Sequence, residues 1–405
     1  MSEVTTNRPG RWRPIGCAAL LLSGCTITPD ARDGASGDEL PCEMVGAVNF
    51  VLRSRQIPGA VVGLVAGDGR LRAQAFGWRD TAARVPMTRE TLFPIGSITR
   101  SITVSAIAVL VNRGVLSWDA TLGDAFASEG GMPEEVKPIT LRQLATHSSG
   151  LPPEPVGWEV DPAGSEPIPY RTSDLLDALR SVELVAAPST GFLYSNFGIA
   201  LLGVVLERSS GQVYADAIET LVLAPLSMRD SGVGAIADQR HRFALGHSWS
   251  DGKLVEQLPV ALGDFAAVGG VYSTVDDLAR FVAAQFDSGG PWSAVTLADM
   301  HRPIVPVLRS GARHASTGWF VESVPQFGRL LANVGQVGGA SAVIAADLDS
   351  GDHLVVFANA DQSAAEQIAR AIFRQIEDRD GGWHYRNEPQ MDAAPTPRPS
   401  PLPAP

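Results

Sequence analysis

Residues 91–100 read TLFPIGSITR and place Ser97 just ahead of a long apolar pattern with helical periodicity. The pattern runs from Ser97 to Arg113 and ends at Gly114, a typical helix stop. A serine in the first turn of a helix lies near free backbone N–H groups and the positive end of the helix dipole, which suits a developing oxyanion. Arg100 is expected on the same helical face as Ser97. Serines that merely cap helices are common, so a catalytic interpretation needs further motifs.

Four further stretches supply those motifs. They are LRQLATHSSGLP (residues 141–152), FLYSNFGIALL (192–202), APLSMRDSG (224–232) and GGVYSTVDDLARF (269–281). With the Ser97 stretch they resemble, in the same order, the class C β-lactamase-like family of the penicillin-binding-protein superfamily, which includes esterases and D-aminopeptidase- or carboxypeptidase-type enzymes. The resemblance covers about residues 41–376. The Ser97 stretch corresponds to the S-x-x-K signature of related enzymes, and residues 194–196 correspond to the Tyr-x-Asn motif of the class C-like branch.

The resemblance implies a role for each matching residue. Ser97 is the nucleophile that forms an acyl-enzyme. Tyr194 takes the proton of that serine and passes it to the leaving group, and Asn196 hydrogen-bonds the substrate and the neighbouring basic residue. A core tyrosine is the alternative interpretation of Tyr194. His147, in the stretch ATHSSGLP, resembles a histidine with a structural role.

The third motif of the family is normally a lysine or histidine followed by threonine and glycine. Its best match is Asn333-Val334-Gly335, in the run ANVGQVGGASAVIAADLDSG. The resemblance assigns Asn333 and Gly335 to substrate binding, together with Gln336. It also implies that the backbone N–H of Gln336 pairs with that of Ser97 to form the oxyanion hole.

Two departures from the family pattern put turnover in question. Arg100 stands where the family has the S-x-x-K lysine, and arginine stays protonated in proteins, so it cannot act as a general base. It can still act as a fixed positive charge that favours the phenolate of Tyr194. Asn333 replaces the basic residue of the third motif and neither titrates nor carries charge. Val334 removes a hydroxyl that family members use near the substrate carboxylate.

Lysine is scarce throughout the chain. Only Lys137 and Lys253 occur, so 30 of the 32 basic residues are arginine, and both lysines fall in predicted surface loops. A chain-wide replacement of lysine by arginine explains how Arg100 arose, but it does not restore a base. General-base assistance is worth about 10²- to 10⁴-fold. Two functions therefore remain open: a weak hydrolase that relies on Tyr194, and a protein that binds its ligand without turnover.

The first hypothesis is a serine hydrolase acting on a small-molecule ester, an amide, a D-amino-acid peptide or a β-lactam through an acyl-Ser97 intermediate. Esters are favoured because their better leaving groups need less proton assistance. The alternative is a catalytically impaired pseudoenzyme that binds peptidoglycan-type ligands in the cell envelope. An unrelated hydrolase or metalloenzyme is disfavoured, because the chain has no suitable Gly-x-Ser-x-Gly or His-Glu-x-x-His motif. We expect no cofactor and no metal.

Both ends of the chain are expected to lie outside the folded domain. Residues 1–24 combine arginines, a short apolar stretch and small residues, which is typical of an export signal. The run LSGC at 22–25 resembles a bacterial lipobox and predicts lipidation of Cys25, although a chance apolar run ending in cysteine is the alternative. Lipidation predicts an exported lipoprotein anchored to a membrane and facing the periplasm or the cell exterior. Residues 25–41 form a polar tether, and residues 379–405 a proline-rich, disordered tail.

The net charge and the cysteine content indicate which partners and which kind of stabilisation the domain can have. Removal of residues 1–24, with three arginines and one glutamate, takes the formal charge from −12 to −14, which argues against nucleic acid as a partner. Of 3 cysteines only Cys42 falls in the expected domain, so no internal disulfide framework is expected. The core must supply the stability, and a hydrophobic content of 45% supports a large core.

The order of apolar patterns predicts the fold class. We expect a β-hairpin at 60–66 and 71–76, helices at 97–113, 174–180, 196–207 and 275–286, strands at 330–334, 341–346 and 353–359, and a closing helix at 364–376. This order predicts an α+β domain over residues 42–378, with an antiparallel sheet flanked by helices and a helical subdomain at roughly 115–270. The resemblance implies a serine β-lactamase/DD-peptidase-like fold.

Overall fold

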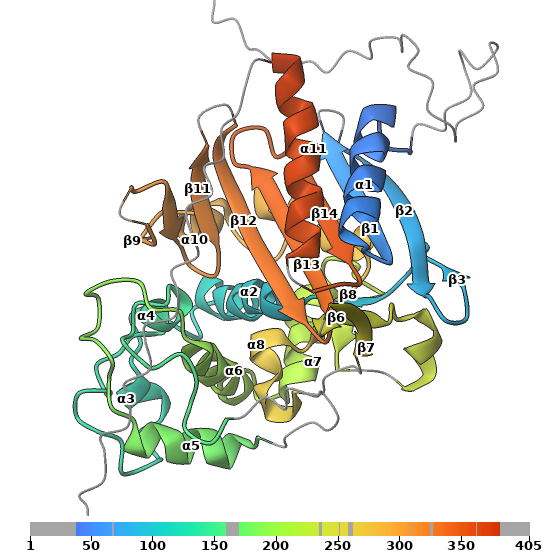
Figure 1. Ribbon diagram of the computed structural model, residues 1–405. Helices are drawn as coiled ribbons and strands as arrows, with labels where there is room; N and C mark the ends of the chain where they lie inside the picture. The colour runs from blue at the N-terminus through green and yellow to red at the C-terminus, as the bar shows by residue number, and fades with distance from the viewer. Residues whose placement is uncertain are drawn as a thin grey trace, which may run out of the picture.

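An antiparallel sheet built from both ends of the chain organises the molecule (Figure 1). The computed structural model describes residues 38–66, 69–158, 170–234, 237–250, 252–257, 262–308, 310–324, 327–361 and 363–380. Within these ranges the sheet has 9 strands, in the order β3 (Val85–Pro86), β2 (Arg70–Asp80), β1 (Gly59–Ala66), β14 (His353–Ala358), β13 (Ala340–Asp347), β12 (Gly328–Val337), β11 (Phe320–Val324), β10 (Arg313–Ala315) and β9 (Val305–Pro306).

Alternate residues of the central strands enter two different cores. In β1, Val62 joins a smaller core formed with α1 (Cys42–Arg55) and α11 (Ala364–Asp380), whereas Val61 faces the larger core on the opposite side. In β14, Val356 likewise joins the smaller core and Phe357 the larger one. Successive side chains of a strand point to opposite faces, so this sheet is covered on both. Figure 1 shows α1 and α11 side by side across one face.

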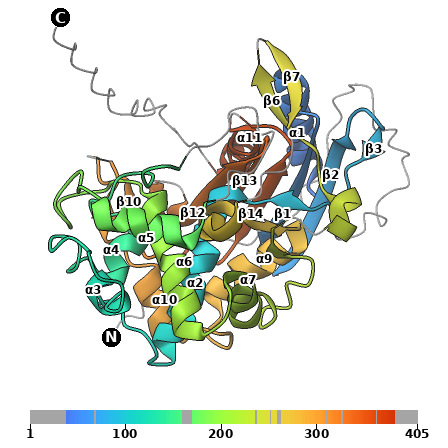
Figure 2. The same ribbon diagram turned by 90° about the horizontal axis from the view of Figure 1, so that it is seen from below.

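The remaining helices gather against the other face and below the sheet (Figure 2). They are α2 (Thr99–Asn112), α3 (Leu122–Ala125), α4 (Leu141–Ala145), α5 (Thr172–Ser181), α6 (Asn196–Ser210), α7 (Tyr214–Ile218), α8 (Ala266–Gly269), α9 (Val275–Ala283) and α10 (Ala294–Met300). Short helical turns add η1 (Gly96–Ile98), η2 (Glu219–Leu223), η3 (Ala237–Arg242), η4 (Gly263–Phe265) and η5 (Ala284–Phe286). Helix α9 packs directly on β1 and β14, and α2 packs on α6. The apolar α2 is therefore enclosed along nearly its whole length.

A second, smaller sheet leads the chain into Ser97. Its strands are β4 (Phe93–Pro94), β8 (Val271–Ser273) and β5 (Gly232–Val233), and a separate hairpin is formed by β6 (Gly246–Ser250) and β7 (Lys253–Gln257). The backbone N–H of Ile95 donates to the carbonyl oxygen of Val271 at 3.0 Å. The N–H of Val271 donates to Thr99 Oγ1 at 3.2 Å. These bonds hold both sides of the η1 turn to one strand.

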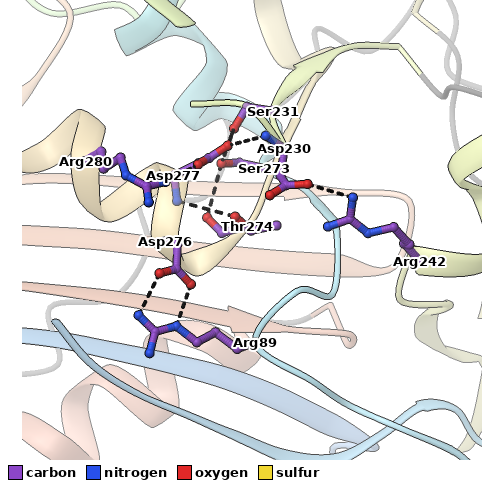
Figure 3. A network of polar contacts seen from close by, with 9 residues as sticks. All are labelled: Arg89, Asp230, Ser231, Arg242, Ser273, Thr274, Asp276, Asp277 and Arg280. Carbon is purple, nitrogen blue, oxygen red and sulfur yellow. Dashed lines mark hydrogen bonds and ion pairs between the residues drawn. The ribbon is translucent and has the colours of Figure 1, made fainter. Parts of the chain in front are cut away.

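A polar network ties this small sheet to the start of α9 (Figure 3). Asp277 is buried, and its Oδ2 accepts from the backbone N–H of Asp230 at 2.7 Å and from Ser231 Oγ at 2.9 Å. Its Oδ1 accepts from Arg280 at 2.5 Å. Burial raises the pKa of the Asp277 carboxyl, and its hydrogen bonds oppose that rise. The carboxylate of the preceding residue, Asp276, accepts hydrogen bonds from Nε and Nη2 of Arg89, each at 2.6 Å. The network thus joins the segments that precede β4 and β5 to the first turn of α9.

The α+β architecture predicted from the sequence is confirmed. The hairpin expected at 60–66 and 71–76 is β1 and β2, and the strands expected near the C-terminus are β12, β13 and β14. The expected helix at 97–113 begins instead as the 3₁₀ turn η1 and becomes α-helical at Thr99. The helix at 275–286 likewise ends in a 3₁₀ turn, η5. Helix α1 carries no motif and was not predicted.

Several expectations fall on residues outside the described ranges. The export signal over residues 1–24, the lipidation of Cys25, most of the tether and residues 381–405 of the tail all lie there. Residues 379 and 380 belong to α11, so the helix extends past the expected end of the domain. In the part of the chain that the structure describes, no helix is both long and apolar enough to cross a membrane.

Candidate active site

Ser97 lies in the sharp turn between β4 and α2. The residue before it, Gly96, has a φ of 52°, and a Cβ placed there would lie 2.5 Å from the backbone nitrogen of Gln336. Both the left-handed backbone and the close approach of β12 therefore require glycine. The serine side chain is half-buried. Its backbone N–H belongs to the first turn of a helix, where the helix itself supplies no acceptor.

Strand β12 brings a second backbone N–H to the same place. Gly338 and Gly339, with φ of 54° and 69°, form a two-residue turn of the type I′ kind between β12 and β13. In such a hairpin Val337 and Ala340 form the first hydrogen-bonded pair, so the N–H of Gln336 points away from β13. Gly335 faces the nucleophile turn, since a Cβ there would lie 3.0 Å from the nitrogen of Ser97.

Tyr194 approaches Ser97 from the helical side. It lies just before α6, where Ser195 caps the helix by accepting from the N–H of Gly198 at 3.0 Å. The hydroxyl of Tyr194 donates to Ser97 Oγ at 3.2 Å. The two side chains come from positions 97 residues apart in the chain. The structure thus brings together the two residues that the sequence assigned to nucleophile and proton transfer.

Arg100 is enclosed behind this pair. Its side chain is 4% exposed, and its guanidinium carbon lies 5.1 Å from the ring centroid of Tyr194 and 4.9 Å from that of Phe320. Burial lowers the pKa of Arg100; the nearby Tyr194 opposes that shift and Arg313 adds to it. Arginine nevertheless keeps its proton in proteins. Arg100 therefore supplies a fixed charge to the site and no proton acceptor.

The side chain of Asn333 bonds to Arg100 and to two of its neighbours. Its side chain is fully buried: Oδ1 accepts from Arg100 Nη2 at 2.5 Å, and Nδ2 donates to Ser101 Oγ and to the carbonyl oxygen of Gly318, the latter at 3.0 Å. The bonds described for this side chain are all made to the protein, and its assignment to substrate binding stays a prediction. The guanidinium of Arg100 reaches β12 and donates to the amide oxygen. Val334 faces the smaller core on the opposite side of the strand.

Asn196 is held by a residue that the sequence did not single out. Its Nδ2 donates to Glu154 Oε1 at 2.6 Å, and its backbone N–H donates to the carbonyl oxygen of Pro153 at 2.8 Å. Burial raises the pKa of Glu154, and the bond from Asn196 opposes that rise. Asn196 Oδ1 has no hydrogen-bond partner among the described residues. The expected contact with a basic residue is not present in this part of the structure, and nothing in the run GLPPEP marks Glu154 in advance.

His147 supports Tyr194 from behind. Its ring stacks on that of Tyr194 with centroids 4.5 Å apart, and its Nδ1 accepts from the backbone N–H of Ser195 at 3.1 Å. Its backbone is left-handed, with a φ of 54°. Burial lowers the pKa of His147 well below its usual value, and the charge of Arg100 lowers it further. The side chain is therefore neutral near pH 7, which agrees with the structural role expected from the sequence.

No other described group replaces the missing base. Lys137 pairs with Glu134, and Lys253 is exposed at the start of β7, in a strand where a loop was expected. In the described ranges, no three histidine, cysteine, aspartate or glutamate side chains are grouped so as to hold a metal ion. The chemistry available at Ser97 is therefore covalent catalysis with a tyrosine as proton acceptor and two backbone N–H groups as oxyanion donors.

Comparison with known proteins gives a consistent result. The sequence model described as Beta-lactamase matches residues 42–377. The esterase EstB of Burkholderia gladioli is 33% identical over 340 residues, which is 74% of this chain and 82% of that protein. A penicillin-binding protein of Bacillus subtilis (strain 168) is 27% identical, over 80% of this chain and 72% of its own length. A class C β-lactamase structure from Rhodobacter sphaeroides, 24% identical, superposes with a TM-score of 0.68 over 83% of this chain and 99% of its own.

Proposed function

The chain belongs to the β-lactamase family of serine hydrolases, and we propose that it hydrolyses an ester or amide through an acyl-Ser97 intermediate. One observation carries the proposal: the hydroxyl of Tyr194 is 3.2 Å from Ser97 Oγ, while the backbone of Gln336 packs against the turn that holds the serine. These contacts support the proposal, because acyl transfer requires a nucleophile, a proton acceptor and an oxyanion site at one point.

Acylation follows from these contacts. With Tyr194 as the phenolate, Ser97 Oγ attacks the carbonyl carbon of the substrate and its proton passes to the phenolate oxygen. The electron pair of the carbonyl bond moves to the carbonyl oxygen, where the N–H groups of Ser97 and Gln336 stabilise the charge. Tyr194 then gives the proton to the leaving group as its bond to the acyl carbon breaks. Water then attacks the acyl carbon and gives its proton to Tyr194, the bond from that carbon to Ser97 Oγ breaks, and Tyr194 returns the proton to Ser97 as the acid product leaves.

Tyr194 can accept a proton only as a phenolate, and the guanidinium carbon of Arg100, 5.1 Å from its ring centroid, places a positive charge beside it. Among the described residues, no carboxylate forms an ion pair with this buried guanidinium. An uncompensated buried charge is costly, and a phenolate at Tyr194 compensates it. A fixed cation does less than a neutral lysine, which would accept a proton itself. The proposal is therefore for a slow hydrolase.

Esters are the favoured substrates. They need less help from a general acid than amides do, because their leaving groups are better. The side chain at 333 carries no charge and is turned toward Arg100, so it offers no cation to a substrate carboxylate of the kind found on β-lactams. The esterase EstB, at 33% identity, supports the same choice. Amides of D-amino acids are the second class to examine.

The test is hydrolysis of p-nitrophenyl acetate and butyrate by the purified protein from pH 6 to 10. We expect Ser97→Ala to lower the rate by about 10³-fold or more and Tyr194→Phe by about 10²- to 10⁴-fold. Ser181→Ala, in the exposed part of α5, is the matched serine control and should leave the rate unchanged. Rates in the parent protein no higher than in Ser97→Ala at every pH would instead favour a non-catalytic protein that binds peptidoglycan-type ligands.

A further inference from the structure

Two guanidinium groups lie over the ring of Phe320, and their surroundings differ. The guanidinium carbon of Arg313 is 4.1 Å from the ring centroid, and that of Arg100 is 4.9 Å from it. Arg313 forms an ion pair with Glu322 at 3.1 Å. Arg100 is more deeply buried, and within the described ranges it has no carboxylate partner. Its charge is therefore available to the other aromatic ring that it contacts, that of Tyr194.

One uncharged side chain bonds to that guanidinium. Asn333 Oδ1 accepts from Arg100 Nη2 at 2.5 Å. The orientation of the amide is fixed, because its Nδ2 donates to Ser101 Oγ and to the carbonyl oxygen of Gly318. In the flipped orientation its N–H donors would face a guanidinium, which itself has only donors. Asn333 is fully buried, so water does not compete for these bonds.

We propose that Asn333 is a positioning residue that holds the guanidinium of Arg100 against Tyr194, so that Arg100 and Asn333 act as one unit that favours the phenolate when Ser97 is acylated. This inference rests on the proposed function. It gives the two departures from the family pattern a common explanation, because the arginine needs an acceptor on β12 and a second cation at position 333 would repel it. The chain thus carries a matched pair of substitutions rather than two independent losses.

The groups around Tyr194 leave Arg100 as the cation that acts on it. His147 stacks on the ring, and burial with the charge of Arg100 keeps this histidine neutral by lowering its pKa. Arg313 lies over Phe320 and is neutralised by Glu322. The hydroxyl itself meets Ser97.

Strand β12 also links this pair to the oxyanion site. Asn333 and Gly335 lie two positions apart, so both face the helical side of the sheet, where they meet Arg100 and the turn that holds Ser97. The next residue, Gln336, supplies the backbone N–H for the oxyanion. A substitution that moves β12 would disturb both functions, so the test must separate charge from packing.

Two substitutions at position 333 make that separation. Asn333→Leu has a similar volume but no acceptor for Arg100, whereas Asn333→Asp keeps an acceptor and neutralises the guanidinium. We expect kcat for p-nitrophenyl acetate to fall about tenfold or more in both variants, with KM changed less. The matched control is Asn359→Leu, which removes an equally buried asparagine. Its Nδ2 donates to the carbonyl oxygens of Trp78 and Leu245 and not to a group that contacts Arg100. We expect it to lower thermal stability without the loss of kcat.

A double-mutant cycle with Arg100→Lys tests the pairing directly. If Asn333 acts through the guanidinium, Asn333→Leu costs much less activity when it is combined with Arg100→Lys than when it is made in the parent protein. Equal losses in both backgrounds would overturn the proposal. Unchanged activity in a well-folded Asn333→Asp protein would overturn it as well, and this variant decides the matter if the leucine variant does not fold.

A readout without turnover distinguishes this inference from the proposed function. The chain has 5 tyrosines, so ¹³C labelling of the ring carbon next to the hydroxyl gives few NMR signals, and Tyr194→Phe assigns the one of interest. We expect the chemical shift of the Tyr194 signal, measured at one fixed pH, to change in Asn333→Leu and Asn333→Asp because the guanidinium over its ring moves or is neutralised. The same chemical shift in all three proteins would show that Asn333 only fills space. A parent protein with no hydrolysis but with these shifts would refute the hydrolase and leave the pairing intact.

Discussion

The candidate site has two halves that are built differently. The oxyanion half consists of backbone: the N–H groups of Ser97 and Gln336, brought together because Gly96 and Gly335 have no side chains to separate them. The proton-transfer half consists of side chains, with Tyr194 in contact with Ser97 and a buried cation behind it. The first half uses no side chain, whereas the second carries Arg100 and Asn333 where the sequence motifs led us to expect a lysine and a second basic residue.

The difference teaches where such a site tolerates change. Backbone donors keep their positions as long as the sheet and the η1 turn form, whatever the neighbouring side chains are. A side-chain half depends on the exact donors and acceptors present, so one exchange there creates an unsatisfied group that a second exchange must satisfy. Arg100 and Asn333 fit this description, since the guanidinium of one donates to the amide oxygen of the other.

The largest effect should come from breaking the backbone half. In Gly96→Ala the new Cβ would lie 2.5 Å from the nitrogen of Gln336, so β12 and the nucleophile turn must move apart. We expect kcat for p-nitrophenyl esters to fall about 10²- to 10³-fold, as it does when one oxyanion donor is lost.

Gly114→Ala is the control for backbone strain alone. Gly114 has a φ of 72°, but a Cβ there meets nothing within 4 Å. It should lose about 1 kcal/mol of stability and keep its activity. Full activity in Gly96→Ala would mean that the N–H of Gln336 takes no part in catalysis.

A smaller effect, and of opposite sign, should come from restoring the family residue in the side-chain half. In Arg100→Lys a side chain that can release its proton replaces one that cannot. We expect the rate at neutral pH to rise about tenfold, within the range of general-base assistance. In the parent protein we expect activity to rise toward alkaline pH, as the phenolate of Tyr194 forms.

Ester hydrolysis from pH 6 to 10 measures both effects, with Arg113→Lys at the exposed end of α2 as the control. A neutral optimum in the parent together with lower activity in Arg100→Lys would contradict this assignment of roles. It would show that Arg100 together with Asn333 supports more catalytic activity than a lysine at position 100 does.

The smallest effect concerns acid stability and sharpens the view that His147 is structural. Its pKa is depressed in the folded protein, so the unfolded chain binds more protons as the pH falls below about 6.5, and the free energy of unfolding then decreases. The loss is at most about 1.4 kcal/mol for each pH unit. Glu154 and Asp277, whose pKa values burial raises, act in the opposite direction.

His147→Asn isolates the contribution of the histidine, because asparagine also tolerates the left-handed backbone at this position. We expect its melting temperature to be lower at pH 7 than that of the parent, since the stack on Tyr194 is lost, but to fall less between pH 7 and pH 5. His314→Asn on β10 is the comparison. An unchanged slope in His147→Asn would mean that His147 already takes up its proton in the folded state.

Local patterns predicted most of the frame around this site. The helix after Ser97, the strand that carries Gly335 and the Tyr-x-Asn segment before α6 each depend on periodicity or a motif within about fifteen residues. The contact between Arg100 and Asn333 spans 233 positions, and nothing in either segment alone indicates it. The sequence presented them as two separate losses, and it assigned Asn333 to substrate binding only because the residue matches the third motif of the family.

Glu154 was missed for a related cause. An acidic residue in a proline-rich loop is usually solvated, and only the fold reveals that Asn196 bonds to it and that burial raises its pKa. The 3₁₀ start of the helix at Ser97 was also missed, because periodicity does not distinguish the two kinds of turn at a helix end.

The pairing of β1 with β14 sets the order in which the protein can be assembled. Ala60 lies opposite Ala358, so the sheet closes a segment of nearly 300 residues, and contacts of such long range form slowly. At 5–20 residues per second, β14 follows β1 out of the ribosome by roughly 15–60 s. During that interval one edge of β1 has no partner strand. The oxyanion site proposed for Ser97 cannot form before Gln336 has been made, so a nascent chain that ends before β12 carries the serine motif without that site.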